Sequence, residues 1–145
     1  MTKKHTTHAR KRSAAAEPSP AEVQAIFALL GEGNTLAAEQ QARRLTLSYP
    51  RHGLGWKLLG ALLTQQNRPA EALPVMQQAA ELLPHDAEVH CNLGLVLQGQ
   101  GLLALAERHL NQAKSLRPSL SDVHSNLRLV YEKQTRFPAD ADSYR

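Results

Sequence analysis

Three consecutive residues, His90, Cys91 and Asn92, carry the side-chain types that cysteine hydrolases use for catalysis. In such an enzyme the imidazole must lie within hydrogen-bond reach of the thiol. The surrounding sequence predicts a helix, on which consecutive side chains point about 100° apart and do not face each other. The spacing therefore does not indicate a catalytic pair, and we expect no enzymatic activity from the residues of this chain.

Other ligand-binding patterns are sparse. Cys91 is the only cysteine, so no internal disulfide can form and no second thiol is available for a metal site. His5 and His8 have a spacing compatible with a metal, but no further ligand type accompanies them. There is no glycine-rich phosphate loop and no pair of carboxylates in a plausible cleft. We therefore predict neither a metal nor a cofactor.

The net charge of +4 is confined to the N-terminus. Residues 1–17 hold five Lys or Arg and one acidic residue, so the rest of the chain is neutral. We expect residues 1–18 to be a disordered basic tail, because they contain too little apolar surface to offset the entropy of ordering. Because the remainder has no basic face, we predict no specific nucleic-acid binding.

No apolar run approaches the ~18–20 residues of a membrane span. The N-terminus also lacks the apolar core of a secretory signal. We therefore expect a cytoplasmic protein without membrane contacts.

The chain repeats itself with a period of 34 residues. The matching positions are Pro50, Pro84 and Pro118; Gly60 and Gly94; Leu59, Leu93 and Leu127; Ala38, Ala72 and Ala106; and Ala79 and Ala113. A fixed period of this size indicates a repeat architecture. Within each period, apolar residues fall at helical spacing and are interrupted by Gly, Asn or Pro, which predicts two helices per repeat.

The segment WKLLGALL, residues 56–63, together with Ala72, Ala79 and Pro84, resembles the tetratricopeptide repeat. The resemblance implies an all-α, right-handed superhelical solenoid of 34-residue helix-turn-helix units. We place this domain at residues 19–145, with repeats at about 17–50, 51–84 and 85–118 and a partial repeat at 119–145. The first and last repeats depart from the pattern: Glu22 replaces the tryptophan, and Arg128, expected to lean outward, replaces the glycine.

His90 and His124 occupy the repeat position that Trp56 holds. We expect these three rings to pack, partly buried, between the two helices of each repeat. If Trp56 is buried, replacing it with alanine should cost about 3–5 kcal/mol.

The segments VHCNLG and VHSNL resemble the repeats of O-linked N-acetylglucosamine transferases and their bacterial relatives. In that family, asparagines in the inner groove bind the backbone of an extended peptide, which implies this role for Asn92 and Asn126. A carboxamide suits the task because it both donates and accepts hydrogen bonds. The alternative is that both asparagines are solvated groove residues without a ligand.

Other residues are expected on the same groove face: Lys57, Ala61, Thr64 and Gln65; Glu88, Cys91, Leu95 and Gln98; and Asp122, Ser125, Leu129 and Lys133. Of these, we expect Lys57, Leu95, Leu129 and Lys133 to tune which peptide binds. The face lacks the clustered Lys and Arg that clamp a terminal carboxylate in chaperone-binding members of the superfamily.

The predicted function is therefore a scaffold that binds a protein or an extended peptide in the groove. The alternative is the N-terminal targeting segment of a larger bacterial glycosyltransferase that resembles the O-linked N-acetylglucosamine family. Residues 137–145 are expected to begin the second helix of the fourth repeat without a polar cap. We expect another repeat, a partner or a second copy of the chain to cover that end.

Overall fold

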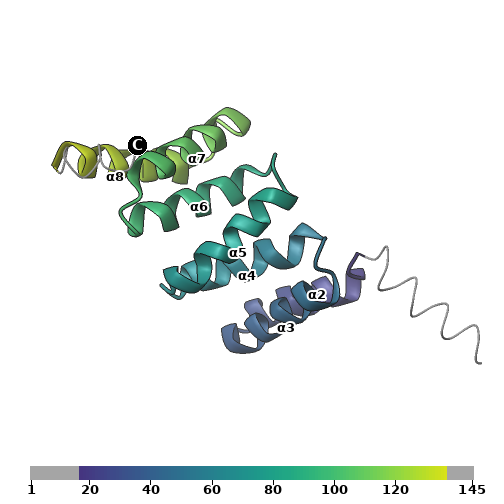
Figure 1. Cartoon of the computed structure of the whole chain (residues 1–145). Coiled ribbons are helices and arrows are strands. Elements are labelled where there is room, and N and C mark those ends of the chain that lie inside the picture. The colour runs from purple at the N-terminus through teal and green to yellow at the C-terminus, as the bar shows by residue number, and fades with distance from the viewer. Residues whose placement is uncertain (1–16, 137–145) are drawn as a thin grey trace, which may run out of the picture.

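The computed structural model describes residues 17–136, which form helices and no strand. The helices are α2 (Pro20–Gly31), α3 (Thr35–Ser48), α4 (Gly53–Gln65), α5 (Pro69–Leu82), α6 (Ala87–Gly99), α7 (Leu103–Leu116) and α8 (Ser121–Arg136). They stack as consecutive hairpins from the purple N-terminal end to the yellow end (Figure 1). This arrangement confirms the all-α repeat fold. No described helix is both long and apolar enough to cross a membrane.

Two expectations fall mostly outside this range. The expected basic tail falls mainly on residues 1–16, and the expected second helix of the fourth repeat falls on residues 137–145; both ranges lie outside the described residues. Of the expected tail only Glu17 and Pro18 are described, and Pro18 is buried.

Each hairpin turns at one residue in the left-handed region of backbone conformation. These residues are Gly33 (φ 75°), Asn67 (φ 55°) and Gly101 (φ 80°), again 34 residues apart. Glycine adopts this conformation without a steric penalty, and asparagine tolerates it better than most residues. Pro69 begins α5, where its missing N–H is not needed. The backbone conformation of the hairpin turns therefore repeats with the same 34-residue period as the sequence.

The tryptophan position closes the loop that enters each repeat. Trp56 Nε1 donates to the Pro50 carbonyl at 3.0 Å, and His90 Nε2 lies 2.8 Å from the Pro84 carbonyl. His124 repeats the contact with Pro118 at 3.2 Å. A carbonyl can only accept, so both histidines carry a proton on Nε2.

Burial at this position varies more than we expected from the sequence. His90 is 3% exposed, whereas Trp56 is half-buried and packs against the apolar core, so its burial meets the condition of the Trp56→Ala prediction only in part. The expectation of partial burial is wrong for His124, which is exposed because no described helix covers its side of α8.

The two helices of a hairpin approach each other closely at the glycine position. A Cβ added at Gly94 would lie 2.5 Å from Leu110 Cγ and 3.3 Å from the Ala106 carbonyl oxygen, and one at Gly60 would collide with Met76. The first repeat reverses the sizes: Ile26 stands at the glycine position, and Ala42 stands where Met76 and Leu110 do. Ile26 and Ala42 are both fully buried in the same core cluster. Each repeat therefore pairs one large and one small residue at this contact.

Arg128, at the same position on α8, is exposed as predicted, with 75% of its side chain accessible.

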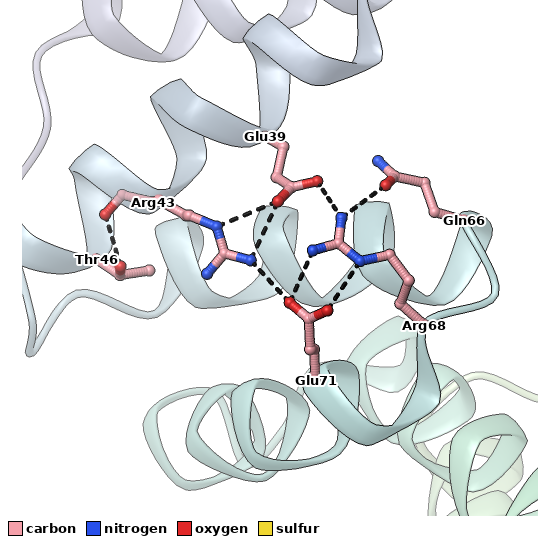
Figure 2. Close-up of polar contacts among 6 residues, drawn as sticks. All are labelled: Glu39, Arg43, Thr46, Gln66, Arg68 and Glu71. Carbon is pink, nitrogen blue, oxygen red and sulfur yellow. Dashed lines mark hydrogen bonds and ion pairs between the residues drawn. The ribbon is translucent and has the colours of Figure 1, made fainter.

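A ring of four charged residues fixes α3 of the first repeat to the start of α5 in the second (Figure 2). Arg43 donates to Glu39 (3.1 Å) and to Glu71 (3.2 Å). Arg68 donates to Glu39 at 2.6 Å and to Glu71 at 2.7 and 3.1 Å, and it also donates to Gln66 at 2.9 Å. Opposite charges alternate around the ring, which satisfies the Glu39 carboxylate although its side chain is only 8% exposed.

One interface further on, the same repeat positions hold Leu73, Gln77, Leu102 and Leu105. Leu73 and Leu102 pack there against the apolar core. The first interface is thus held by ions where the next is held by apolar contacts. The sequence contained a partial signal for the ring, because Glu39 and Arg43 are four residues apart on one helix and Arg68 and Glu71 are three apart.

The ring also sets the protonation of Glu39. Burial by itself raises the pKa of this carboxyl, but hydrogen bonds from Arg68 and Arg43 outweigh that effect and hold the pKa below its ordinary value of 4.5.

The close approach at Gly94 gives the first testable prediction. Gly94→Ala should lower the free energy of unfolding by about 1–3 kcal/mol, because the new methyl group meets Leu110 and a backbone carbonyl. Gly31→Ala is the matched control: its Cβ would meet nothing within 4 Å, so the change should be neutral or stabilising by up to ~1 kcal/mol. Urea unfolding measures both, and equal effects would contradict this packing.

A second prediction concerns the ion ring. A carboxyl whose pKa is lowered in the fold stabilises above its unfolded pKa and loses that contribution as the pH falls through the folded value. Glu39→Gln should therefore cost about 1–3 kcal/mol at pH 6, and the gap from wild type should narrow progressively as the pH falls below the ordinary value of 4.5. The exposed Glu81 provides the control, Glu81→Gln. A gap for Glu39→Gln that is independent of pH would exclude the charge as its cause.

Candidate functional site

The first helices of the second, third and fourth repeats lie next to one another. Helix α6 contacts both α4 and α8 directly. Two polar contacts join α8 to α6: Asn126 Nδ2 donates to Cys91 Sγ at 3.5 Å, and Lys133 Nζ donates to the backbone carbonyl of Gln98 at 3.4 Å. Four of the predicted groove-face residues therefore meet in pairs along the line of contact between α6 and α8, which we call the seam.

Asn92 stands at the same repeat position as Asn126, on the preceding helix. It is half-buried, and its carboxamide has no hydrogen-bond partner among residues 17–136. Leu95, one turn further along α6, is half-buried, and Leu129 is 39% exposed. Asn92 therefore keeps its full hydrogen-bonding capacity, whereas one amide proton of Asn126 is already used.

Lys57 is engaged within the chain. Its ammonium lies 2.8 Å from Asp86 and 3.4 Å from Glu88, so it bridges α4 to the start of α6. Burial lowers the pKa of Lys57, but these carboxylates outweigh it and raise the pKa above its ordinary value. Glu88 in turn meets Arg117 at 3.1 Å. These charges largely neutralise one another along the entrance to α6.

Cys91 and His90 do not form a catalytic pair. His90 Nδ1 lies 3.2 Å from His109 Nδ1, and its other nitrogen faces the Pro84 carbonyl. Burial raises the pKa of the Cys91 thiol, with the hydrogen bond from Asn126 acting weakly in the opposite direction. Within the described residues, no three His, Cys, Asp or Glu side chains gather in a way that could hold a metal ion.

A small pocket opens between the end of α4, the start of α5 and the last turns of α6. Its volume is about 250 Å³, and its lining is Thr64, Asn67, Pro69, Leu95, Val96, Gln98 and Gly99. Three of these, Thr64, Leu95 and Gln98, belong to the predicted groove face. The sequence indicated Gly99 only as a turn residue; nothing in the repeat pattern showed that it borders a pocket.

Two models of the tetratricopeptide repeat match the sequence, over residues 28–87 and 63–128. The chain belongs to the tetratricopeptide repeat family. No curated protein sequence matches it significantly.

Solved structures show the same fold. An O-GlcNAc transferase mutant from Thermobaculum terrenum is 28% identical with a TM-score of 0.68, over 79% of this chain and 23% of that one. YrrB, described as a tetratricopeptide protein with an unusual peptide-binding site, is 21% identical with a TM-score of 0.71, over 86% of this chain and 68% of YrrB. The Yersinia enterocolitica secretion chaperone SycD, in complex with a peptide of the translocator YopD, is 18% identical with a TM-score of 0.69, over 78% and 92%.

The state of Cys91 gives a third prediction. Because the side chain is 4% exposed and its thiol pKa is raised, alkylation by iodoacetamide at pH 7.5 should be at least about tenfold slower in the folded protein than in urea. Mass spectrometry of timed samples measures both rates. Equal rates would show that this part of α6 is open to solvent.

Proposed function

We propose that the chain is a scaffold that binds an extended peptide or a segment of a partner protein along α4, α6 and α8. The observation that carries the proposal is the Asn92 carboxamide. It is half-buried, lacks a partner among the described residues, and stands one repeat before Asn126. A peptide backbone offers both a donor and an acceptor, which a carboxamide can pair with together.

The neighbouring charges support an extended, largely neutral ligand. Lys57 and Glu88 are already paired with other residues of the chain, so they add little net charge for a peptide terminus. Leu95 and Leu129 offer apolar surface beside the asparagines, and Lys133 lies at the far end of the seam. Peptide binding by YrrB and SycD is consistent with this use of the fold.

The proposal predicts that Asn92→Ala combined with Asn126→Ala lowers partner-peptide affinity by about tenfold or more, because each carboxamide contributes hydrogen bonds of ~0.5–1.5 kcal/mol. The partner is first identified by pull-down and mass spectrometry. Calorimetry then compares wild type, the double variant and Asn111→Ala, an exposed asparagine on α7 outside the groove face. The double variant should melt within a few degrees of wild type. Unchanged affinity would rule the asparagines out as backbone ligands.

We keep one second candidate: the chain as the targeting segment of a larger bacterial glycosyltransferase. The similarity to the O-GlcNAc transferase favours it, and the matched part spans 23% of that chain. The transfer chemistry would then belong to residues outside this sequence. The genomic sequence after the codon for Arg145 tests this candidate: a nucleotide-sugar-binding domain there supports it, and a stop codon contradicts it.

A further inference from the structure

Gly99 is one of the residues that line the pocket beside α6. Gly99 is the last residue of α6, and a Cβ added there would meet nothing within 4 Å. The other walls are the half-buried Leu95 and Thr64, the buried Val96 and the ring of Pro69. The hydroxyl of Thr64 donates to the Gly60 carbonyl at 2.7 Å, so this hydroxyl proton is not available to a ligand.

Gln98 is the one lining residue whose polar group lacks a partner while it is mostly buried. The residue is 8% exposed, and its carboxamide makes no hydrogen bond within the part of the chain that the structure describes. The amide nitrogen and oxygen still reach the solvent, so a ligand in the pocket that offers a peptide group can form hydrogen bonds with them. This side chain therefore indicates what the pocket binds beyond its apolar walls.

We propose that this pocket, lined by Thr64, Leu95, Gln98 and Gly99 among others, is a specificity pocket for one uncharged apolar side chain of a bound peptide, whose backbone amide pairs with Gln98. The volume of about 250 Å³ suits a single large side chain and is below the ~300–1,000 Å³ of pockets for whole small molecules. No lining residue is charged, so an ionic side chain would be desolvated there without compensation.

The position of the pocket fits the proposed function, on which this inference rests. Leu95 follows Asn92 by three residues, so both lie on one face of α6, about 5–6 Å apart at Cβ. Side chains on the same face of an extended peptide repeat every ~6.8 Å. A peptide whose backbone meets Asn92 can therefore place a nearby side chain in the pocket.

The test uses small probes that need only the pocket. ¹⁵N-labelled protein, full chain, is titrated with N-acetyl-leucine amide, with N-acetyl-phenylalanine amide and with the charged N-acetyl-glutamate amide. The two apolar probes should bind in the millimolar range and shift the amide signals of Thr64, Leu95, Gln98 and Gly99. The glutamate probe should shift none of them up to the same concentration.

Two matched variants decide whether the pocket is responsible. Gly99→Leu adds a large side chain at the edge of the pocket and should weaken the apolar probes at least tenfold. Gly31→Leu makes the same change at the equivalent residue of α2, where the Cβ also meets open space, and should leave binding unchanged. Gln98→Met keeps the side-chain volume and should weaken binding severalfold. Wild-type affinity in Gly99→Leu, or equal shifts from the glutamate probe, would overturn the proposal.

A third variant separates this inference from the proposed function. Asn92→Ala should leave probe binding unchanged, because the probes are too short to require the peptide backbone that Asn92 is proposed to hold. If the probes bind but the asparagine variants do not affect a partner peptide, the pocket stands and the backbone proposal fails. If the probes shift no pocket signal, the pocket proposal fails whatever the asparagines do.

Discussion

The fold depends on one steric constraint, the close approach of the two helices in each hairpin. At this contact one residue must be small and its neighbour large, as Gly94 and Leu110 show. A hairpin of two short helices cannot cover its own apolar face, so its stability comes from stacking on its neighbours. The helices can stack in register only if each hairpin keeps the same thickness, which the pairing of sizes ensures. The reversal at Ile26 and Ala42 meets the constraint with the sizes exchanged.

Stacking is achieved by different chemistry at successive interfaces. Glu39, Arg43, Arg68 and Glu71 form a closed ion ring between the first two repeats, where leucines stand at three of the same four positions one repeat later. The half-exposed members of the ring are open to screening by salt, unlike the apolar contacts. The solenoid can therefore keep one geometry throughout while its first interface responds to pH and ionic strength differently from the next.

Much of the fold could be predicted from the sequence because the period fixes it. The 34-residue period of the sequence is also the period of the loop prolines and of the residues in the left-handed conformation, Gly33, Asn67 and Gly101. The ion ring was missed because its residues do not repeat, and its closure depends on contacts 28 and 29 residues apart. The repeat pattern also did not predict how deeply each side chain is buried: His90 and His124 share a position, yet only His90 is covered by a neighbouring helix.

For the candidate site, the sequence predicted which residues share a face. It did not indicate that Lys57 is held by Asp86, or that Gly99 and Gln98 border a pocket, since both facts depend on neighbours in other repeats.

The central claim is that the carboxamides of Asn92 and Asn126 contact the backbone of a bound peptide. The most direct measurement is the side-chain NH₂ signals of these two residues in an NMR spectrum, assigned through their alanine variants, with and without the partner peptide. The account predicts that both pairs of signals shift on binding, with Asn92 shifting more because Asn126 already donates to Cys91. Binding that leaves both pairs unmoved, and shifts only signals from α3, α5 and α7, would contradict it.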